Sequence, residues 1–369
     1  MKIAFVTFRG GTAQSGVLSK INNQVDCWIE MGNDVSVLCK SPLMSKVLYR
    51  NPIVIGYNSE NKSISKRWIT RLSKLSEIGK CLAQFKPDII YYRYSSYRPF
   101  LFYYFKKTAP YVIEINSNDL SEFKLMGNVT YIINLIFRGV LLNGASGFFA
   151  VTKELAHLSI YKKYQKPTCV ISNGIELSKK RILAPANNIR PSLVFSGSPN
   201  MSWHGVDKIL KLAILTPEFD YHIIGYSKTD VSNRSFPINV KFHGYLVEDE
   251  YDKIIEMADI GIGTLALHRK KMEEACPLKV REYLAYGLPV IIGYKDTDLH
   301  KSLPFVLQIP NEERNVWRNI ELIKKFVLKN KGIRVARCDV APFIDIKKKE
   351  QQRLIFMSDI LKKYSKVRK

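Results

Sequence analysis

The segment EACPLKVREYLAYGLPVI, residues 274–291, contains the signals for a loop, a short helix and a buried strand. Pro277 is placed where a first helical residue would be, a position at which the missing N–H of proline costs little. Gly287 can end the helix, because glycine readily adopts the left-handed backbone conformation common at helix ends. We therefore expect a helix between these two residues and a strand directly after them.

The start of this expected helix is also a natural site for an anion. Backbone N–H groups and the helix dipole concentrate positive charge there. Lys279 and Arg281 lie in the first turn or so, where the dipole alone would favour acidic residues, and a bound anion would reverse that penalty. Simple solvation of both side chains explains the same pattern equally well. Two carboxylates flank the site, with Glu274 in the loop and Glu282 inside the helix.

Apolar runs alternate with helical segments through the first half of the chain. Residues 3–8 form a continuous apolar run, typical of a strand buried on both faces of a parallel sheet. A turn with two glycines and a helix to about residue 30 follow. Further strands are expected at residues 34–39, 87–92, 112–114 and 147–151. This alternation predicts a doubly wound α/β domain with a ligand crevice at the carboxyl ends of its strands.

The same pattern begins again after a polar, proline-containing segment at residues 177–190, which we interpret as an interdomain linker. The next expected strands lie at residues 193–197, 221–224, 240–242, 260–262 and 289–292. We expect an N-terminal domain at 1–176, a C-terminal domain at 191–342, and a final helical segment, 343–369, that crosses back to the first domain. The predicted fold is thus two Rossmann-like, doubly wound domains facing a central cleft.

Composition limits the classes of partner and compartment. The chain has 369 residues, which favours two domains, and a formal net charge of +24. Such a charge attracts phosphate-bearing partners, whether nucleotides, nucleic acid or anionic lipid. The six cysteines have no short paired spacing, so we expect neither a zinc site nor a disulfide scaffold. We expect a cytoplasmic protein, either soluble or peripheral on the inner face of the cell membrane.

Two apolar segments bear on membrane contact. Residues 131–142 are interrupted by Asn134 and Arg138 and are too short to span a bilayer. A second segment, residues 64–78, carries an apolar stripe at helical spacing surrounded by Lys and Arg. The stripe fits an ordinary crossover helix that packs on a sheet. It also fits a basic interfacial helix on an anionic membrane surface.

The paired glutamates at 274 and 282 and the following AYGLPVI resemble the motif of GT-B fold glycosyltransferases of the retaining family 4, which includes many bacterial polysaccharide enzymes. Shorter segments at 171–175, 242–244 and 257–261 support the resemblance in the same order along the chain. It implies transfer of a sugar from a nucleoside-diphosphate sugar to a growing surface glycan or lipid-linked acceptor. It also implies retention of configuration, and neither a metal ion nor another cofactor.

By this resemblance Glu274 faces the donor sugar and Glu282 accepts hydrogen bonds from the ribose hydroxyls, which suits an acceptor-only carboxylate. The backbone at Pro277 and Leu278 would hold the diphosphate at the helix start. The resemblance also places two loop glycines on the donor side, and these are Gly11 and Gly197.

Two cations that the family often uses for the diphosphate are absent here. Ser198 follows Gly197 where an arginine is common, and His204 precedes Gly205 where a lysine is common. Our hypothesis is that Lys279 replaces them, with Arg281 or His204 helping. A plain loop histidine explains His204 as well.

The first domain also departs from the family pattern, because a histidine near the sugar is missing. The sequence Glu114-Ile115-Asn116 occupies the equivalent turn, so Asn116 is our catalytic candidate and Asp119 an alternative. Arg93, at the end of a predicted strand, is placed to meet an acceptor phosphate or a donor group. A surface salt bridge is the simpler interpretation of Arg93.

Other functions fit parts of the sequence. A sugar-nucleotide epimerase of the same two-domain fold would need a carboxylate or histidine base in its cleft. A nucleic-acid-binding protein would explain the charge, but we find no zinc finger, RNA-recognition motif or basic tract interleaved with aromatics. The acidic pair Asp296 and Asp298 resembles a metal-binding pair of another glycosyltransferase fold; we interpret it as a helix cap and expect no metal site.

Overall fold

The computed structural model describes residues 1–8, 16–39, 53–54, 64–98, 100–231 and 235–368, with the side chains of 53–54, 64–74, 125–126, 248 and 367–368 left out. The chain divides into two compact units. Unit 1 comprises Met1–Ser172 together with Lys347–Lys369, and unit 2 comprises Asn173–Ile346.

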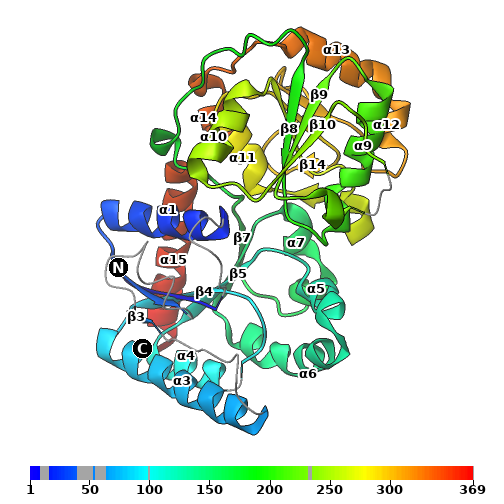
Figure 1. Ribbon diagram of the computed structural model, residues 1–369. Coiled ribbons are helices and arrows are strands. Elements are labelled where there is room, and N and C mark those ends of the chain that lie inside the picture. The colour runs from blue at the N-terminus through cyan, green and yellow to red at the C-terminus, as the bar shows by residue number, and fades with distance from the viewer. Residues whose placement is uncertain (9–15, 40–52, 55–63, 99, 232–234, 369) are drawn as a thin grey trace. The chain divides into compact units, whose positions relative to one another are not determined.

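Unit 1 is built on a parallel sheet in the order β3-β2-β1-β4-β5-β6-β7 (Figure 1). Its strands are β1 (Lys2–Thr7), β2 (Asp34–Cys39), β3 (Ile53–Val54), β4 (Ile89–Arg93), β5 (Tyr111–Ile115), β6 (Gly147–Ala150) and β7 (Thr168–Val170). The strand order reverses between β1 and β4, which makes this edge the topological switch point of the sheet. Strands β4, β5 and β6 are buried along their whole length, as the continuous apolar runs predicted.

Helices connect the strands of unit 1. They are α1 (Gly16–Glu30), α3 (Ile64–Phe85), α4 (Leu101–Thr108), α5 (Asp119–Met126), α6 (Asn128–Gly144), α7 (Lys153–His157), α8 (Ser159–Lys162) and α15 (Ile346–Arg368). In α3, the described end of the apolar stripe is buried at Leu75 and Ile78, so this part acts as a crossover helix. The stripe residues Ile64, Trp68 and Leu72 lie outside the described side chains.

The last helix, α15, belongs to unit 1 from Lys347 onward. Met357 and Ile360 join the core cluster that holds Ile3, Phe5 and Trp28. The Trp28 indole N–H donates to Glu350 Oε2 at 2.9 Å, which ties α1 to α15 through a buried polar contact. The C-terminal segment thus completes the core of the unit that contains the N-terminus.

Unit 2 has a parallel sheet in the order β10-β9-β8-β11-β13-β15, with a separate pair β12-β14. Its strands are β8 (Ser192–Ser196), β9 (Asp220–Ile224), β10 (Val240–Gly244), β11 (Ile260–Ile262), β12 (Glu274–Ala275), β13 (Val290–Ile292), β14 (Lys295–Asp296) and β15 (Val306–Gln308). The strand order reverses between β8 and β11, which is the switch point of this sheet.

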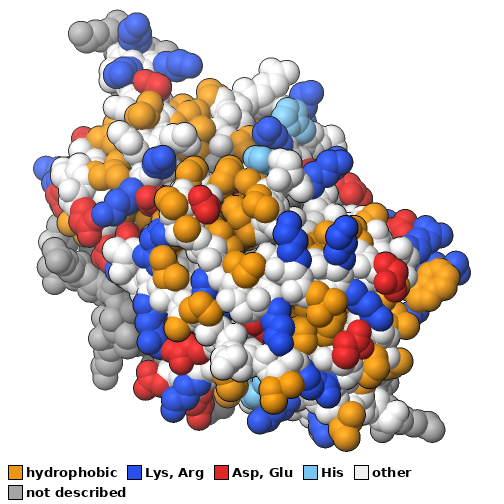
Figure 2. Space-filling view, turned by 90° about the horizontal axis from the view of Figure 1, so that it is seen from above, with side chains coloured by type: hydrophobic (Ala, Val, Ile, Leu, Met, Phe, Trp, Pro, Cys, Tyr) orange, Lys and Arg blue, Asp and Glu red, His pale blue; other side chains and the backbone are white. Residues whose placement is uncertain are grey.

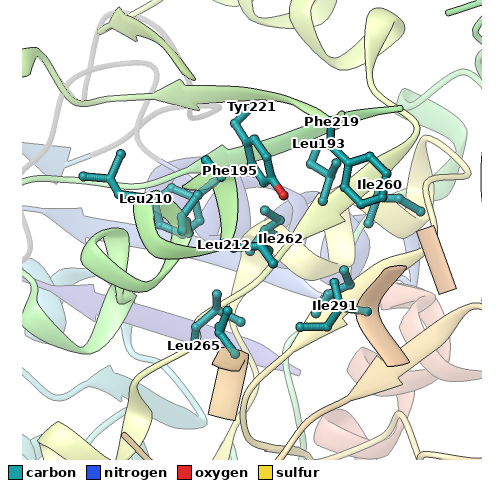
Figure 3. Close-up of a cluster of buried hydrophobic side chains, with 14 of the residues drawn as sticks. Leu193, Phe195, Leu210, Leu212, Phe219, Tyr221, Ile260, Ile262, Leu265 and Ile291 are labelled. Atoms are coloured by element: carbon teal, nitrogen blue, oxygen red, sulfur yellow. The ribbon is translucent and has the colours of Figure 1, made fainter. Parts of the chain in front are cut away.

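Six α-helices and four 3₁₀ turns of unit 2 are described. They are α9 (Val206–Leu215), α10 (Glu248–Met257), α11 (Leu278–Ala285), α12 (Asn315–Arg318), α13 (Ile320–Asn330), α14 (Arg337–Ile344), η1 (Leu177–Lys179), η2 (Ser202–His204), η3 (Lys228–Asp230) and η4 (Leu267–Lys270). Figure 3 shows the core beneath them, where side chains of β8, β9 and β11 meet Leu210 and Leu212 of α9.

The segment interpreted as a linker, residues 177–190, belongs to unit 2 instead. Leu177 and Leu183 are buried in it, and the Leu183 N–H donates to the Tyr286 carbonyl at 3.3 Å. Arg334 Nε donates to the Ala184 carbonyl at 3.1 Å. The unit boundaries fall at 172/173 and 346/347. The polar segment was misinterpreted because contacts to its backbone, which leave no apolar pattern in the sequence, hold it against unit 2.

Two surface properties bear on partners. Among the described residues, no helix is both long and apolar enough to cross a membrane. On the face in Figure 2, Lys and Arg side chains are scattered, with hydrophobic and acidic side chains between them. This scatter differs from the single basic stripe typical of nucleic-acid-binding surfaces.

Candidate functional site

The candidate site of unit 2 lies where the loop after β8 meets the start of α11. Parallel α/β sheets bind ligands outside the carboxyl ends of their strands, at the switch point, and β8 and β11 flank that point here. Tyr283 of α11 ties the two parts together. Its hydroxyl accepts from the Ser196 N–H at 2.7 Å and donates to Ser196 Oγ at 3.1 Å.

Helix α11 begins at Leu278, with Pro277 as the preceding cap residue rather than the first helical one. No described side chain caps this end, so the N–H groups of the first turn are left for another acceptor. Gly287 ends the helix region with φ +88°, the left-handed conformation expected from the sequence. The result is a short helix whose positive end is open to an anionic ligand.

Lys279 places a cation at this helix start. Its Nζ is shut off from solvent, has no hydrogen-bond partner among the described residues, and lies 4.1 Å from the centre of the Phe195 ring in β8. Burial lowers the pKa of Lys279 to about 7. A buried ammonium without a counter-ion is costly, and an anion bound beside it would remove that cost.

Arg281 does not help Lys279, contrary to our hypothesis. Its side chain is fully buried and pairs with Asp296 and Asp298, with Nη2 2.7 Å from Asp296 Oδ1 and 2.8 Å from Asp298 Oδ2. Its Nε donates to the Asn173 carbonyl at 3.3 Å. All of its nitrogens therefore serve the packing of unit 2, and Arg281 faces inward because of this acidic pair.

The acidic pair has the same structural role. Asp296 Oδ1 accepts from the N–H groups of Asp298 and Leu299 at 3.0 and 3.2 Å, so it closes a turn while it holds Arg281. No group of three or more described His, Cys, Asp or Glu side chains could hold a metal ion. Independence from metal stays a prediction.

His204 is also not a side chain that is free to bind a phosphate. It is buried, and its Nδ1 lies 3.0 Å from the Tyr226 hydroxyl. Burial and the nearby Lys279 charge lower the pKa of His204 to about 2, so the ring is neutral at pH 7. His204 therefore supplies no positive charge, and Lys279 is the remaining member of the proposed set.

The backbone at Gly197 lies so close to its neighbours that no side chain fits there. A Cβ at this position would lie 2.8 Å from His204 Nδ1 and from the Phe195 ring. The neighbouring loop approaches more closely still, since a Cβ at Gly225 would lie 1.9 Å from the Gly197 carbonyl oxygen. Glycine at 197 therefore permits the close approach of this loop to His204 and to the loop after β9.

Glu282 is held by two residues that the sequence interpretation missed. Its Oε1 accepts from Lys180 Nζ at 2.8 Å, and its Oε2 accepts from the Tyr251 hydroxyl at 3.0 Å. The Glu282 side chain remains 27% exposed. Lys180 Nζ also donates to Tyr286, which donates in turn to Asp252. Lys180 lies in the segment that we interpreted as a linker, and nothing in its sequence indicated a contact with Glu282.

Glu274 lies in β12, a two-residue strand paired with β14, and its side chain is half-buried. Leu278 is half-buried as well. Glu274 in β12 and Leu278, Lys279 and Glu282 in α11 therefore lie on two consecutive elements. The order of loop, helix and strand agrees with the sequence prediction.

Unit 1 holds a buried charge cluster at its own switch point. Glu114 of β5 accepts from Lys20 Nζ and from Arg93 Nη1, each at 2.7 Å, and all three side chains are buried. Burial raises the pKa of Glu114, but Lys20, Arg93 and Arg353 outweigh it and hold that pKa well below its usual range. Burial lowers the pKa of Lys20 to about 8. Arg93 therefore forms a buried rather than a surface ion pair.

A small pocket opens beside this cluster. It lies past the ends of β4 and β5, and its lining includes Arg93, Asn116 and Asp119. Asn116 is half-buried, and its Oδ1 accepts from Lys20 Nζ at 3.4 Å. Asp119 is less available than expected, because Arg138 binds both of its oxygens at 2.8 and 2.9 Å and Tyr161 donates to it. Gly11 lies outside the described residues.

Comparison with known proteins gives structural matches alone. No protein-family model and no curated protein matches the chain. Sucrose-phosphate synthase from Thermosynechococcus elongatus is 13% identical, with a TM-score of 0.71 over 97% of this chain and 98% of that one. Anabaena Alr3699/HepE, solved with UDP and glucose, is 14% identical, with a TM-score of 0.64 over 97% and 100%. The chain has the GT-B glycosyltransferase fold.

A third match extends the comparison. The lipopolysaccharide outer core galactosyltransferase WaaB, in its apo form, is 13% identical with a TM-score of 0.61. The match covers 97% of this chain and 100% of WaaB. Since these alignments span nearly the whole of each chain, the fold predicted from the alternating pattern is confirmed for both Rossmann-like units.

Proposed function

We propose that this protein is a glycosyltransferase that binds a nucleoside-diphosphate sugar in unit 2. The observation that carries the proposal is Lys279, a buried ammonium with no described counter-ion at an uncapped helix start. Two acceptor-only carboxylates, Glu274 and Glu282, lie on either side of it in sequence. A diphosphate supplies the missing negative charge, and the flanking sugar and ribose supply hydroxyls for the carboxylates.

The same residues support bond cleavage. When the bond between the anomeric carbon and the diphosphate oxygen breaks, the leaving diphosphate gains negative charge. The first-turn N–H groups of α11 and the Lys279 ammonium are fixed donors for that charge, so they stabilise it more in the transition state than in the bound donor. An acceptor hydroxyl attacking from the face of the departing diphosphate would retain the anomeric configuration, as in the family that the sequence resembles.

Glu282 is suited to ribose binding once its present hydrogen-bond donors share the carboxylate or leave it. Its oxygens already accept from Lys180 and Tyr251, so ribose hydroxyls would share or replace these donors. The interaction with Lys180 holds the carboxylate in one orientation. Lys180 and Tyr251 are therefore positioning residues for the donor.

The acceptor would bind in unit 1, on the surface beside the small pocket whose lining includes Asn116. An acceptor sugar offers hydroxyls for Asn116, whereas the charge of Arg93 is already paired with Glu114. HepE was solved with UDP-glucose, and WaaB is a lipopolysaccharide galactosyltransferase. These matches support a UDP-sugar donor and a surface glycan acceptor. Catalysis without a metal ion is part of the same proposal.

The first test is a thermal-shift panel of UDP-, GDP-, ADP- and CMP-sugars on the full chain. A ligand at about 100 times its dissociation constant stabilises the folded protein by about 2.7 kcal/mol. We expect one nucleotide class to raise the melting temperature, with and without a chelator. No shift with any of the four would contradict donor binding.

Product analysis then separates transfer from epimerisation. The donor that gives a shift is incubated alone and with bacterial glycan or lipid-linked acceptors, and the sugar products are identified. A glycosyltransferase leaves the configuration of the free donor unchanged and forms a glycosidic product with the acceptor. Conversion of the donor to its epimer without any acceptor would show the other reaction.

A further inference from the structure

Helix α6 exposes an apolar face that an ordinary surface helix would not. Val129, Ile132, Ile136 and Val140 are 72%, 51%, 63% and 47% exposed. At 100° per residue they fall within one stripe along the helix. Globular proteins usually place charged or polar side chains on such a face.

The single charged residue of α6 points the other way. Arg138 is buried in its pair with Asp119, and Asn134 is buried and accepts from the Tyr97 N–H at 2.6 Å. The two residues that interrupt the apolar sequence therefore face the interior of unit 1. The solvent side of α6 carries no charge along Asn128–Gly144, about 25 Å of helix.

Lysines border this face on two sides. At the end of α6, Gly144 packs against Phe102 of α4, and Lys106 Nζ lies 5.7 Å from the centre of the Phe102 ring. Near Gly139 lies Tyr164, whose ring centre is 5.2 Å from Lys163 Nζ. Both lysines are exposed. The helix lies at the edge of unit 1, beside α5 (Figure 1).

We propose that the exposed face of α6 docks unit 1 on an anionic membrane surface. The four apolar side chains of the stripe enter the boundary between headgroups and acyl chains, and the bordering lysines meet lipid phosphates. The helix lies in the interface and does not cross it, since no described helix can span a membrane. We place the docking surface on α6; in α3 the stripe residues Leu75 and Ile78 are buried, and Ile64, Trp68 and Leu72 lie outside the described side chains.

Charge complementarity favours lipid over a second copy of this chain. In a two-fold dimer the same patch meets itself, so the lysines at its border would approach one another. With a net charge of +24, two copies also repel each other as wholes. An anionic lipid surface offers the opposite charge and an apolar layer together.

The test is flotation of the full chain with phosphatidylcholine vesicles that contain or lack phosphatidylglycerol. We expect the wild type to float with the anionic vesicles at low salt, and more weakly as salt rises. The variant I132E/I136E should lose at least about tenfold in apparent vesicle affinity, because two charges replace apolar side chains in the interface. The variant K106A/K163A should lose about tenfold on anionic vesicles alone.

The matched control is L322E/L328E, which adds the same two charges on α13 of unit 2, where Leu322 and Leu328 are 48% and 60% exposed. It should float almost as the wild type does. Melting curves check that each variant is folded, and I132S/I136S serves as a replacement if I132E/I136E is not. Equal flotation of wild type and I132E/I136E, or no flotation of the wild type at low salt, overturns the proposal. A lipid-independent change from dimer to monomer in I132E/I136E overturns it in favour of a second copy.

Discussion

Lys279 and Arg281, near the start of α11, have different roles because different charges surround them. Lys279 has no described counter-ion, and burial brings its pKa to about 7, so it gains from binding an anion. Arg281, two residues later, is neutralised by Asp296 and Asp298. The sequence shows two cations at a helix start, but which one faces a ligand depends on contacts with residues fifteen or more positions away.

Arg281 is expected to matter for stability rather than for donor contact. The substitution Arg281→Met leaves Asp296 buried without its cation, and breaking such a pair costs about 3–5 kcal/mol of unfolding free energy. Denaturant unfolding measures the change. Arg318→Met is the control, because Arg318 pairs with Glu312 at the surface and its loss should cost less than about 1 kcal/mol. Equal effects of the two substitutions would contradict the structural role of Arg281.

Glu114 links stability to pH in unit 1. Its folded-state pKa lies below the ordinary value of about 4.3, so its contribution is complete above that pH and is lost as pH falls. Glu114→Gln should cost about 3 kcal/mol at pH 7, because Lys20 and Arg93 lose their anion.

The difference in unfolding free energy between wild type and Glu114→Gln should shrink as the pH is lowered below about 4.5. Denaturant unfolding at a series of pH values measures this difference. Glu256→Gln is the control, since Glu256 pairs with Arg181 in a largely exposed position and should cost less than about 1 kcal/mol at any pH. A gap for Glu114→Gln that stays constant down to pH 2 would rule out this linkage.

At the scale of elements, the loops after β8 and β9 are fixed by backbone contact. Gly225→Ala should destabilise unit 2 by about 3 kcal/mol or more, because its Cβ would lie 1.9 Å from the Gly197 carbonyl oxygen at a φ of +82°. Gly244→Ala provides a matched control. Its φ is +65°, but no atom lies within 4 Å of the new Cβ, so the cost should be about 1–2 kcal/mol. Thermal unfolding measures the loss of stability in both variants. An equal loss would contradict the close approach of the Gly225 and Gly197 loops.

The elements themselves could be predicted well from the sequence. The apolar run at residues 3–8 became β1, Lys2–Thr7, and the signals at Pro277 and Gly287 frame α11. Buried parallel strands and helix ends leave local signals because proline, glycine and continuous apolar runs act within a few residues. The polar segment 177–190 left none, and it holds Lys180, the partner of Glu282.

At the scale of the whole molecule, the chain combines two parallel sheets that each carry polar residues at a switch point. In unit 1 these are Lys20, Arg93 and Glu114, and in unit 2 they are Lys279 and Glu282. Sequence periodicity predicted both sheets. It did not predict Lys20, because a buried lysine on an otherwise ordinary helix face has no periodic signature.

The most direct test of donor binding is calorimetric titration of the full chain with the nucleotide sugar that stabilises it, between pH 6 and about 8.5, for wild type and Lys279→Met. Below pH about 7 the Lys279 ammonium is already charged, so affinity should be constant. Above that pH, binding must take up a proton, and the dissociation constant should rise by up to about tenfold per pH unit. Lys279→Met should bind at least about tenfold more weakly at pH 6 and lack this pH dependence. Absence of binding by the wild type, or identical curves for both proteins, would contradict the account.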